Sequence, residues 1–148
     1  MLARSIEQQQ RQQQHRGGTS ARRPRVLCAD DCPSTRALYR GVFGAEGFDF
    51  DEACDGTSAV GKVTVSRPDV VVLDFQMPGM DGGEALRLLA RCRATRHIPV
   101  VIATATPDAV PKEVRVLAAA IVAKPCDPDE VVAVVRALVP RSKVFRAE

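Results

Sequence analysis

The fold is decided by the stretch VVVLDFQMPGMDG at residues 70–82, where four apolar residues end in the carboxylate of Asp74 and in turn-forming residues. A continuous apolar run of this length predicts a strand that is buried on both faces, as in a parallel sheet. Such a strand delivers the residue after its last core position to the carboxyl edge of the sheet, where ligands bind in open α/β folds. Asp74 therefore stands where chemistry is expected.

Strand and helix patterns alternate from Arg25 onward. Five such repeats predict an α/β fold with a doubly wound five-stranded parallel sheet, order 2-1-3-4-5, flavodoxin-like, with five helices and right-handed crossovers. The predicted strands cover residues 26–29, 48–53, 70–73, 98–103 and 120–123. The predicted helices cover residues 34–46, 57–66, 83–94, 107–118 and 128–138.

The chain has 148 residues, of which 45% are hydrophobic and 4% aromatic, so a single domain with a core of valine, alanine and leucine is expected. No apolar stretch approaches the ~20 residues that a membrane helix needs. The first residues, MLARSIEQQQ, contain no apolar region typical of a signal peptide. These features predict a cytoplasmic protein without a membrane partner.

Charge and composition divide the chain into a leader at residues 1–24, a folded domain at residues 25–139 and a tail at residues 140–148. Residues 1–25 hold six arginines against one glutamate, a balance of +5, whereas the remainder holds 15 basic and 17 acidic side chains, a balance of −2. The leader is rich in glutamine and arginine and predicts disorder. No aromatic residue lies among its arginines, so nucleic acid is not expected as a partner.

Five cysteines are scattered along the chain, and none forms a C-x-x-C pair. This pattern argues against a disulfide framework and against a structural zinc site. Reduced and mostly buried thiols are the expectation.

Polar residues follow four of the predicted strands: Asp30 and Asp31 after the first, Asp74 after the third, Thr104 after the fourth and Lys124 after the fifth. Strands one and three are neighbours at the switch point, so the three carboxylates should share one pocket. Carboxylates that close repel one another unless a cation is present, and oxygen ligands favour Mg²⁺. A hydroxyl and an ammonium beside them suit a phosphoryl group on Asp74.

The region 25–139 resembles the receiver domain of bacterial two-component response regulators, which are phosphorelay signal-transduction proteins. The resemblance rests on four segments distributed along the chain: the pair Asp30-Asp31 followed by Pro33, the run D-x-x-M-P-G-M-D-G from Asp74, the segment IPVVIATA at 98–105, and Lys124-Pro125.

The resemblance implies that Asp74 accepts a phosphoryl group from a histidine kinase or a histidine phosphotransfer protein. It implies that Thr104 and Lys124 contact the phosphoryl oxygens, and that the chain catalyses only its own phosphorylation and a slow dephosphorylation. It also implies a Mg²⁺ site, held by Asp30, Asp31, Asp74 and the main-chain carbonyl of Gln76.

Three departures from the receiver pattern concern the output step. Receivers usually carry an aromatic residue three positions before the lysine, where this chain has Ile121, and a phenylalanine after Lys-Pro, where it has Cys126. The stretch between Thr104 and Lys124 is also about two residues shorter than in that family. We expect an altered output face beside a complete phosphorylation site.

No effector domain is recognised in residues 140–148, so output is expected through a separate partner protein, through a second copy of the chain, or through transfer of the phosphoryl group onward. A phosphatase of the haloacid dehalogenase type would need an aspartate where Gln76 stands, and a flavodoxin would need a hydroxyl-rich loop where the sequence is Asp-Asp-Cys-Pro. A receiver fold that acts as a phosphorylation-independent adaptor remains an alternative because of Ile121 and Cys126.

Overall fold

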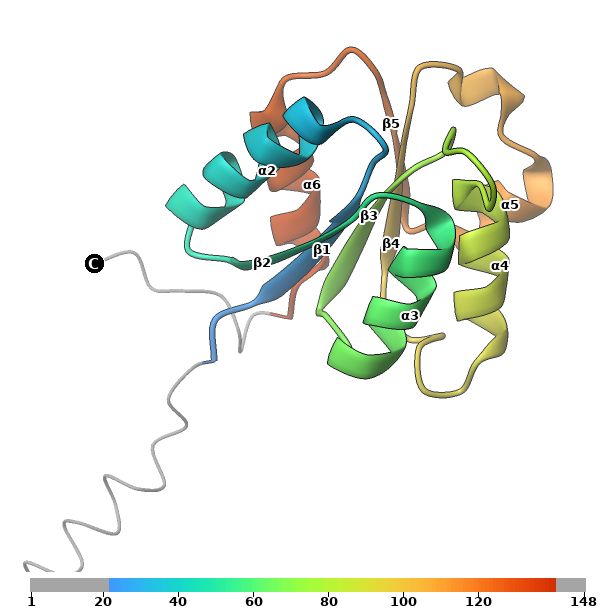
Figure 1. The fold of residues 1–148 in the computed structure, drawn as a ribbon, viewed down its shortest axis with the longest axis horizontal. Helices are drawn as coiled ribbons and strands as arrows, with labels where there is room; N and C mark the ends of the chain where they lie inside the picture. The colour runs from blue at the N-terminus through green and yellow to red at the C-terminus, as the bar shows by residue number, and fades with distance from the viewer. Residues whose placement is uncertain (1–21, 141–148) are drawn as a thin grey trace, which may run out of the picture.

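A five-stranded parallel sheet forms the middle layer of the computed structural model, which describes residues 22–140 (Figure 1). The strand order is β2-β1-β3-β4-β5, so the predicted doubly wound α/β fold is confirmed. The strands are β1 (Arg25–Ala29), β2 (Asp49–Ala53), β3 (Val70–Asp74), β4 (Val100–Thr104) and β5 (Ala120–Ala123). Most of the predicted leader and tail lies outside the described residues, so the boundaries of the predicted domain stay predictions.

Helices cover both faces of this sheet (Figure 1). Three of them begin directly after an aspartate whose side chain accepts a hydrogen bond from the first turn: Asp55, Asp81 and Asp127. This is the usual way to satisfy the free N–H groups at the start of a helix. The helices are α2 (Pro33–Ala45), α3 (Gly56–Ser66), α4 (Gly82–Arg91), α5 (Lys112–Leu117) and α6 (Pro128–Leu138), with a 3-10 turn η1 (Pro107–Ala109).

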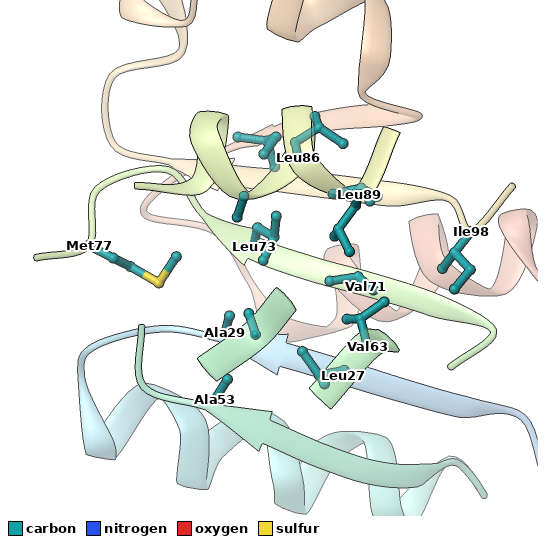
Figure 2. Packing of buried hydrophobic residues seen from close by; sticks show 14 of the residues in the cluster. Leu27, Ala29, Ala53, Val63, Val71, Leu73, Met77, Leu86, Leu89 and Ile98 are labelled. Carbon is teal, nitrogen blue, oxygen red and sulfur yellow. The ribbon is translucent and has the colours of Figure 1, made fainter. Parts of the chain in front are cut away.

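Two apolar cores lie on opposite sides of the sheet. One joins alternate residues of β1, β3 and β4 to α3, α4 and α5 (Figure 2). The other joins the remaining strand residues to α2 and α6, with Phe43 at its centre. Every residue of β3 and β4 is buried, as the apolar run at 70–73 predicts. The sheet is therefore a rigid base for the side chains that follow its strands.

The predicted helix at 107–118 is wrong in its length. The structure has the short turn η1, then Val110 and Pro111, and only then the six-residue α5. Pro111 has no N–H and disfavours a helical conformation in the residue before it, so a continuous helix cannot pass through this position. The connection between β4 and β5 is consequently the least regular crossover of the described fold.

Other differences are limited to the ends of elements. The predicted helix at 83–94 ends at Arg91, because the buried Thr95 hydroxyl donates a 2.7 Å hydrogen bond to the carbonyl of Leu89 and turns the chain. The fourth strand begins at Val100 rather than at Ile98, and the second begins at Asp49. Shifts of one or two residues at such ends are ordinary.

The expectation of mostly buried thiols is wrong. Cys28, inside β1, is buried, but Cys32, Cys54 and Cys92 are exposed and Cys126 is partly exposed. The exposed thiols stand at the ends of strands or helices, where an apolar side chain is not required by the sheet or by a helix face. No disulfide forms among the described cysteines, which are all free.

None of the helices that the structure describes has the length and apolar character needed to cross a bilayer.

Candidate functional site

Three carboxylates meet at the carboxyl edge of the sheet. Asp30 and Asp31 follow β1, and Asp74 ends β3, which pairs with β1 so that Ala29 stands beside Leu73. One oxygen from each carboxylate lies within 4.8 Å of the other two. Asp30 is only 4% exposed and Asp74 only 9%, whereas Asp31 faces solvent. The sheet topology thus brings together acids that are 43 or 44 positions apart in the chain.

Lys124, which follows the edge strand β5, brings a positive charge to these carboxylates. Its Nζ donates a 2.7 Å hydrogen bond to Oδ2 of Asp30 and lies 3.6 Å from Oδ1 of Asp74. The backbone fixes this position, because the N–H of Lys124 donates a 2.7 Å hydrogen bond to the carbonyl of Thr104. Lys124 is followed by a cis peptide bond to Pro125. The ammonium therefore interacts with two carboxylates, of which that of Asp30 is the closer.

Burial and neighbouring charges both shift the pKa values of Asp74 and Lys124. Burial of Asp74 and the neighbouring charge of Asp30 raise the pKa of the Asp74 carboxyl, although the charge of Lys124 acts in the other direction. Burial alone would lower the pKa of Lys124, but its hydrogen bond to Asp30 and the charge of Asp74 outweigh that and raise it. One ammonium therefore leaves the negative charge around Asp74 incompletely compensated.

Asp30 is held in place from the main chain and from α2. Its Oδ1 accepts a 2.9 Å hydrogen bond from the N–H of Cys32. The guanidinium of Arg36 donates a 2.7 Å hydrogen bond to the Asp30 carbonyl oxygen. Arg36 was not assigned to the site from the sequence. Its position on the first turn of α2, six residues after Asp30, is the signal that could have identified it. Asp30 consequently presents a fixed oxygen pair to the pocket.

The turn between β3 and α4 packs tightly around the backbone of Asp74. The N–H of Gln76 donates a 3.3 Å hydrogen bond to Oδ1 of Asp74, and the N–H of Gly82 donates a 2.9 Å hydrogen bond to the Phe75 carbonyl. A Cβ on Gly82 would collide with the Asp74 carbonyl oxygen and would lie 2.9 Å from Cα of Phe75. Gly79 has a φ of +74°, which favours glycine. This turn therefore requires its glycines for shape.

Thr104 ends β4, beside Ala123 and one residue beyond the partner of Asp74. It is completely buried, and its Oγ1 accepts a 3.0 Å hydrogen bond from the N–H of Thr106. A second hydrogen bond of 3.4 Å joins the hydroxyls of Thr104 and Thr106, and either of them can be its donor.

Comparison with known proteins places this arrangement in a family. The model of the response regulator receiver domain matches residues 26–136. The chain belongs to this family. The DNA-binding response regulator MtrA of Mycolicibacterium smegmatis is 39% identical over 128 residues, which are 85% of this chain and 55% of that protein. The response regulator PleD of Caulobacter vibrioides is 40% identical over 81 residues, which are 55% of this chain and 18% of that protein.

The chain spans about half the length of the MtrA relatives that it matches. Among solved structures, the response regulator TrrA of Thermotoga maritima in complex with Mg²⁺-BeF has a TM-score of 0.72 and 28% identity, covering 78% of this chain and 99% of that one. The chemotaxis response regulator CheY4 of Vibrio cholerae has a TM-score of 0.73 at 24% identity, covering 79% and 99%, and supports the fold.

In this receiver domain the residues that depart from the family pattern are placed by β5 and the segment after it. Ile121 lies on β5, is partly buried and packs against the core under α3, α4 and α5. Cys126 lines a groove of about 320 Å³ beside Lys124, together with Tyr39 and Leu38 of α2. An apolar branched side chain therefore occupies the place of the usual aromatic residue, and a small thiol occupies that of the usual phenylalanine.

Proposed function

We propose that this receiver domain is a phosphoacceptor switch in which Asp74 accepts a phosphoryl group from a histidine kinase or a histidine phosphotransfer protein. The observation that carries the proposal is the group of Asp30, Asp31 and Asp74 within 4.8 Å, with Lys124 bound to Asp30 and close to Asp74. A carboxylate with a raised pKa, a mobile ammonium and a metal-binding acid pair is a combination that suits phosphoryl transfer.

The chemistry of the donor set fits Mg²⁺. Three carboxylates supply hard oxygen ligands without histidine or cysteine, and the raised pKa of Asp74 reflects, besides burial, negative charge that a cation would compensate. When bound, the ion would neutralise the carboxylates and the charge on the transferring phosphoryl oxygens. The solved structure of TrrA with Mg²⁺-BeF supports the same choice of metal. We assign the ion to Asp30, Asp31, Asp74 and the main-chain carbonyl of Gln76.

The transfer itself is assigned to the side chains of this chain. An Asp74 carboxylate oxygen forms a bond to phosphorus while the bond from phosphorus to the donor histidine nitrogen breaks, and the electron pair of that bond stays on the imidazole. Lys124 then exchanges part of its contact with Asp30 for a phosphoryl oxygen. The Thr104 hydroxyl, which accepts a hydrogen bond from the Thr106 N–H, donates a hydrogen bond to another phosphoryl oxygen.

We place this switch in the bacterial cytoplasm and propose that its phosphorylated form changes binding to a separate protein or to a second copy of the chain. Phosphorylation would shift an existing equilibrium between two conformations. A second candidate function is a phosphorylation-independent adaptor, which is favoured by Ile121, because it lacks the ring whose rotation would report the phosphoryl group. Both functions use the same fold and differ in whether Asp74 reacts.

The decisive experiment incubates the protein with acetyl phosphate and Mg²⁺ and measures the intact mass. We expect one phosphoryl-sized increase that needs Mg²⁺ and is absent in Asp74→Asn. Asp81→Asn is the matched control, because Asp81 caps α4 a few residues away and should leave labelling intact. If a folded wild-type protein gains no mass, the adaptor becomes the better description. Labelling that persists at one site in Asp74→Asn would show that another residue is the acceptor.

A further inference from the structure

A group of exposed arginines lies at the amino edge of the sheet, opposite the carboxylates. These residues belong to the loops that precede strands, which lie at the lower end of the view in Figure 1. They come from the segment before β1, the end of α3, and the end of α4 with the loop before β4. We define the amino-edge surface as Arg22, Arg23, Arg67, Arg91, Arg93 and Arg96, all of which are exposed.

Two grooves are lined by three of these arginines, which are far apart in sequence. Arg22, Arg67 and His97 line one groove of about 430 Å³. Arg96 and His97 line a second groove of about 470 Å³, so His97 joins the two. The helices α3 and α4, which both end at this edge, pack against each other. The surface is therefore continuous across three parts of the fold.

Most of these arginines have no partner within the described part of the chain. Arg22 is the exception, because its guanidinium lies 3.4 Å from a carboxylate oxygen of Asp69; pairs of this kind also join Arg40 to Glu52 and Arg87 to Glu113. Among residues 22–140, the side chains of Arg67, Arg91, Arg93 and Arg96 form no ion pair or hydrogen bond with one another or with any other described residue. Within the described part of the chain, nothing therefore competes with an anion from outside for these guanidinium groups.

We propose that the amino-edge surface binds the phosphate backbone of duplex nucleic acid. A guanidinium presents paired N–H donors that match phosphate oxygens, which makes arginine better suited than lysine to this contact. Residues 1–21, which precede Arg22, hold three arginines and one glutamate, a balance of +2, and Arg22 itself lines the groove at this surface. A ligand with a long regular series of negative charges can contact several of the arginines of this surface at once.

The composition of the surface favours phosphates over bases and over a membrane. The described aromatic side chains are buried or partly buried, so none offers an exposed platform for stacking on bases. The loop at residues 91–97 reads RCRATRH and has no large apolar side chain to insert into lipid. The acidic carboxyl edge would repel the same ligand, so the amino edge is the side that approaches it. The leader alone gave no reason to expect nucleic acid, because the arginines that carry this proposal are brought together only by folding.

The test measures binding of the full chain to a fluorescent DNA duplex of mixed sequence at several salt concentrations. In Arg91→Gln/Arg93→Gln/Arg96→Gln we expect at least about tenfold weaker binding, and a salt slope that is smaller by about one for each phosphate that the variant no longer neutralises. The matched control, Arg40→Gln/Arg87→Gln/Lys112→Gln, removes the same charge from α2, α4 and α5 and should bind nearly as the wild type does. In Arg91→Lys/Arg93→Lys/Arg96→Lys the salt slope should stay and the affinity should fall modestly.

Three results would overturn the proposal. The first is wild-type protein that does not bind the duplex at low salt. The second is an equal reduction in affinity for the glutamine triple variant and its control, which would show that net charge rather than this surface decides binding. The third is stronger binding to polyglutamate or to phosphatidylserine vesicles than to the duplex, with the same dependence on Arg91, Arg93 and Arg96. Circular dichroism of each variant verifies that its fold is unchanged.

Discussion

The two edges of the sheet carry charges of opposite sign, which are buried and paired at one edge and exposed at the other. At the carboxyl edge, Asp30 and Asp74 are buried and share the ammonium of Lys124. At the amino edge, Arg91, Arg93 and Arg96 are exposed and have no partner among the described residues. Charges of the first kind are coupled to folding because each depends on its neighbours, whereas charges of the second kind interact mainly with water. The same substitution should therefore have very different effects at the two edges.

The largest effect should come from Lys124→Met. Without the ammonium, Asp30 and Asp74 are left as buried carboxylates with no cation, so we expect a loss of about 3 kcal/mol in the free energy of unfolding at neutral pH without metal. Chemical denaturation measures this. Arg40→Gln, which breaks the exposed pair with Glu52, should cost less than about 0.5 kcal/mol. The contrast between the edges would fail if both variants were equally mild.

Gly82→Ala should have the next largest effect on stability, because the added methyl group meets the main chain of Asp74 and Phe75 rather than a flexible side chain. We expect a loss of about 2 kcal/mol in the free energy of unfolding, with slower phosphorylation if Asp74 is displaced. Gly61→Ala is the control: Gly61 lies inside α3 with nothing within 4 Å of a new Cβ. That control should gain about 0.5 kcal/mol. If the two variants changed the free energy of unfolding by the same amount, the turn would accommodate the added methyl group without strain.

Asp74→Asn should stabilise the protein in metal-free buffer, raising its Tm by about 4 °C at pH 7. The pKa of Asp74 is raised in the folded protein, so the carboxyl favours folding below its unfolded pKa, and this contribution is lost as pH rises through the folded value. Asparagine carries no charge to lose, so the difference should vanish near pH 3 (about one unit below an ordinary aspartate pKa). Thermal unfolding across pH 3–8 checks this, and a destabilised variant at pH 7 would contradict the account of repulsion.

The smallest effect on stability should come from the amino edge. Arg91→Gln/Arg93→Gln/Arg96→Gln should change the free energy of unfolding by less than about 0.5 kcal/mol, because these exposed side chains form no ion pair or hydrogen bond within residues 22–140. Urea denaturation provides the value. A decrease of several kcal/mol would show that these arginines have structural partners, and the proposed difference between the edges would then be wrong.

The sequence predicted the fold because its local signals were strong and agreed with one another. The apolar run at 70–73 became the fully buried β3, and the helix predicted at 128–138 has the same bounds as α6. The positions of Asp30, Asp74 and Lys124 followed from topology, since parallel strands end at one edge. Their chemical roles remain proposals, because position alone does not show reactivity.

What the sequence did not predict depends on contacts between distant segments. Pro111 divides the stretch 107–118, which was predicted as one helix, because proline cannot continue a helix through this position. Thr95 ends α4 through a buried hydrogen bond that no spacing reveals. The grouping of Arg22, Arg67 and Arg96 needed the folded chain, because 29 or more positions separate each from the next. Patterns within a few residues are readable in sequence, and surfaces assembled from several loops are not.

One groove at the amino edge is lined by both Arg22 and Pro140, the first and last residues that the structure describes. The described ends of the domain thus lie close together on the side away from Asp74. A circularly permuted domain could be made by joining residues 22 and 140 through a short linker and opening the loop near Arg93. In a fusion, the same geometry would let the domain be inserted into a surface loop of another protein with the carboxyl edge of the sheet facing outward.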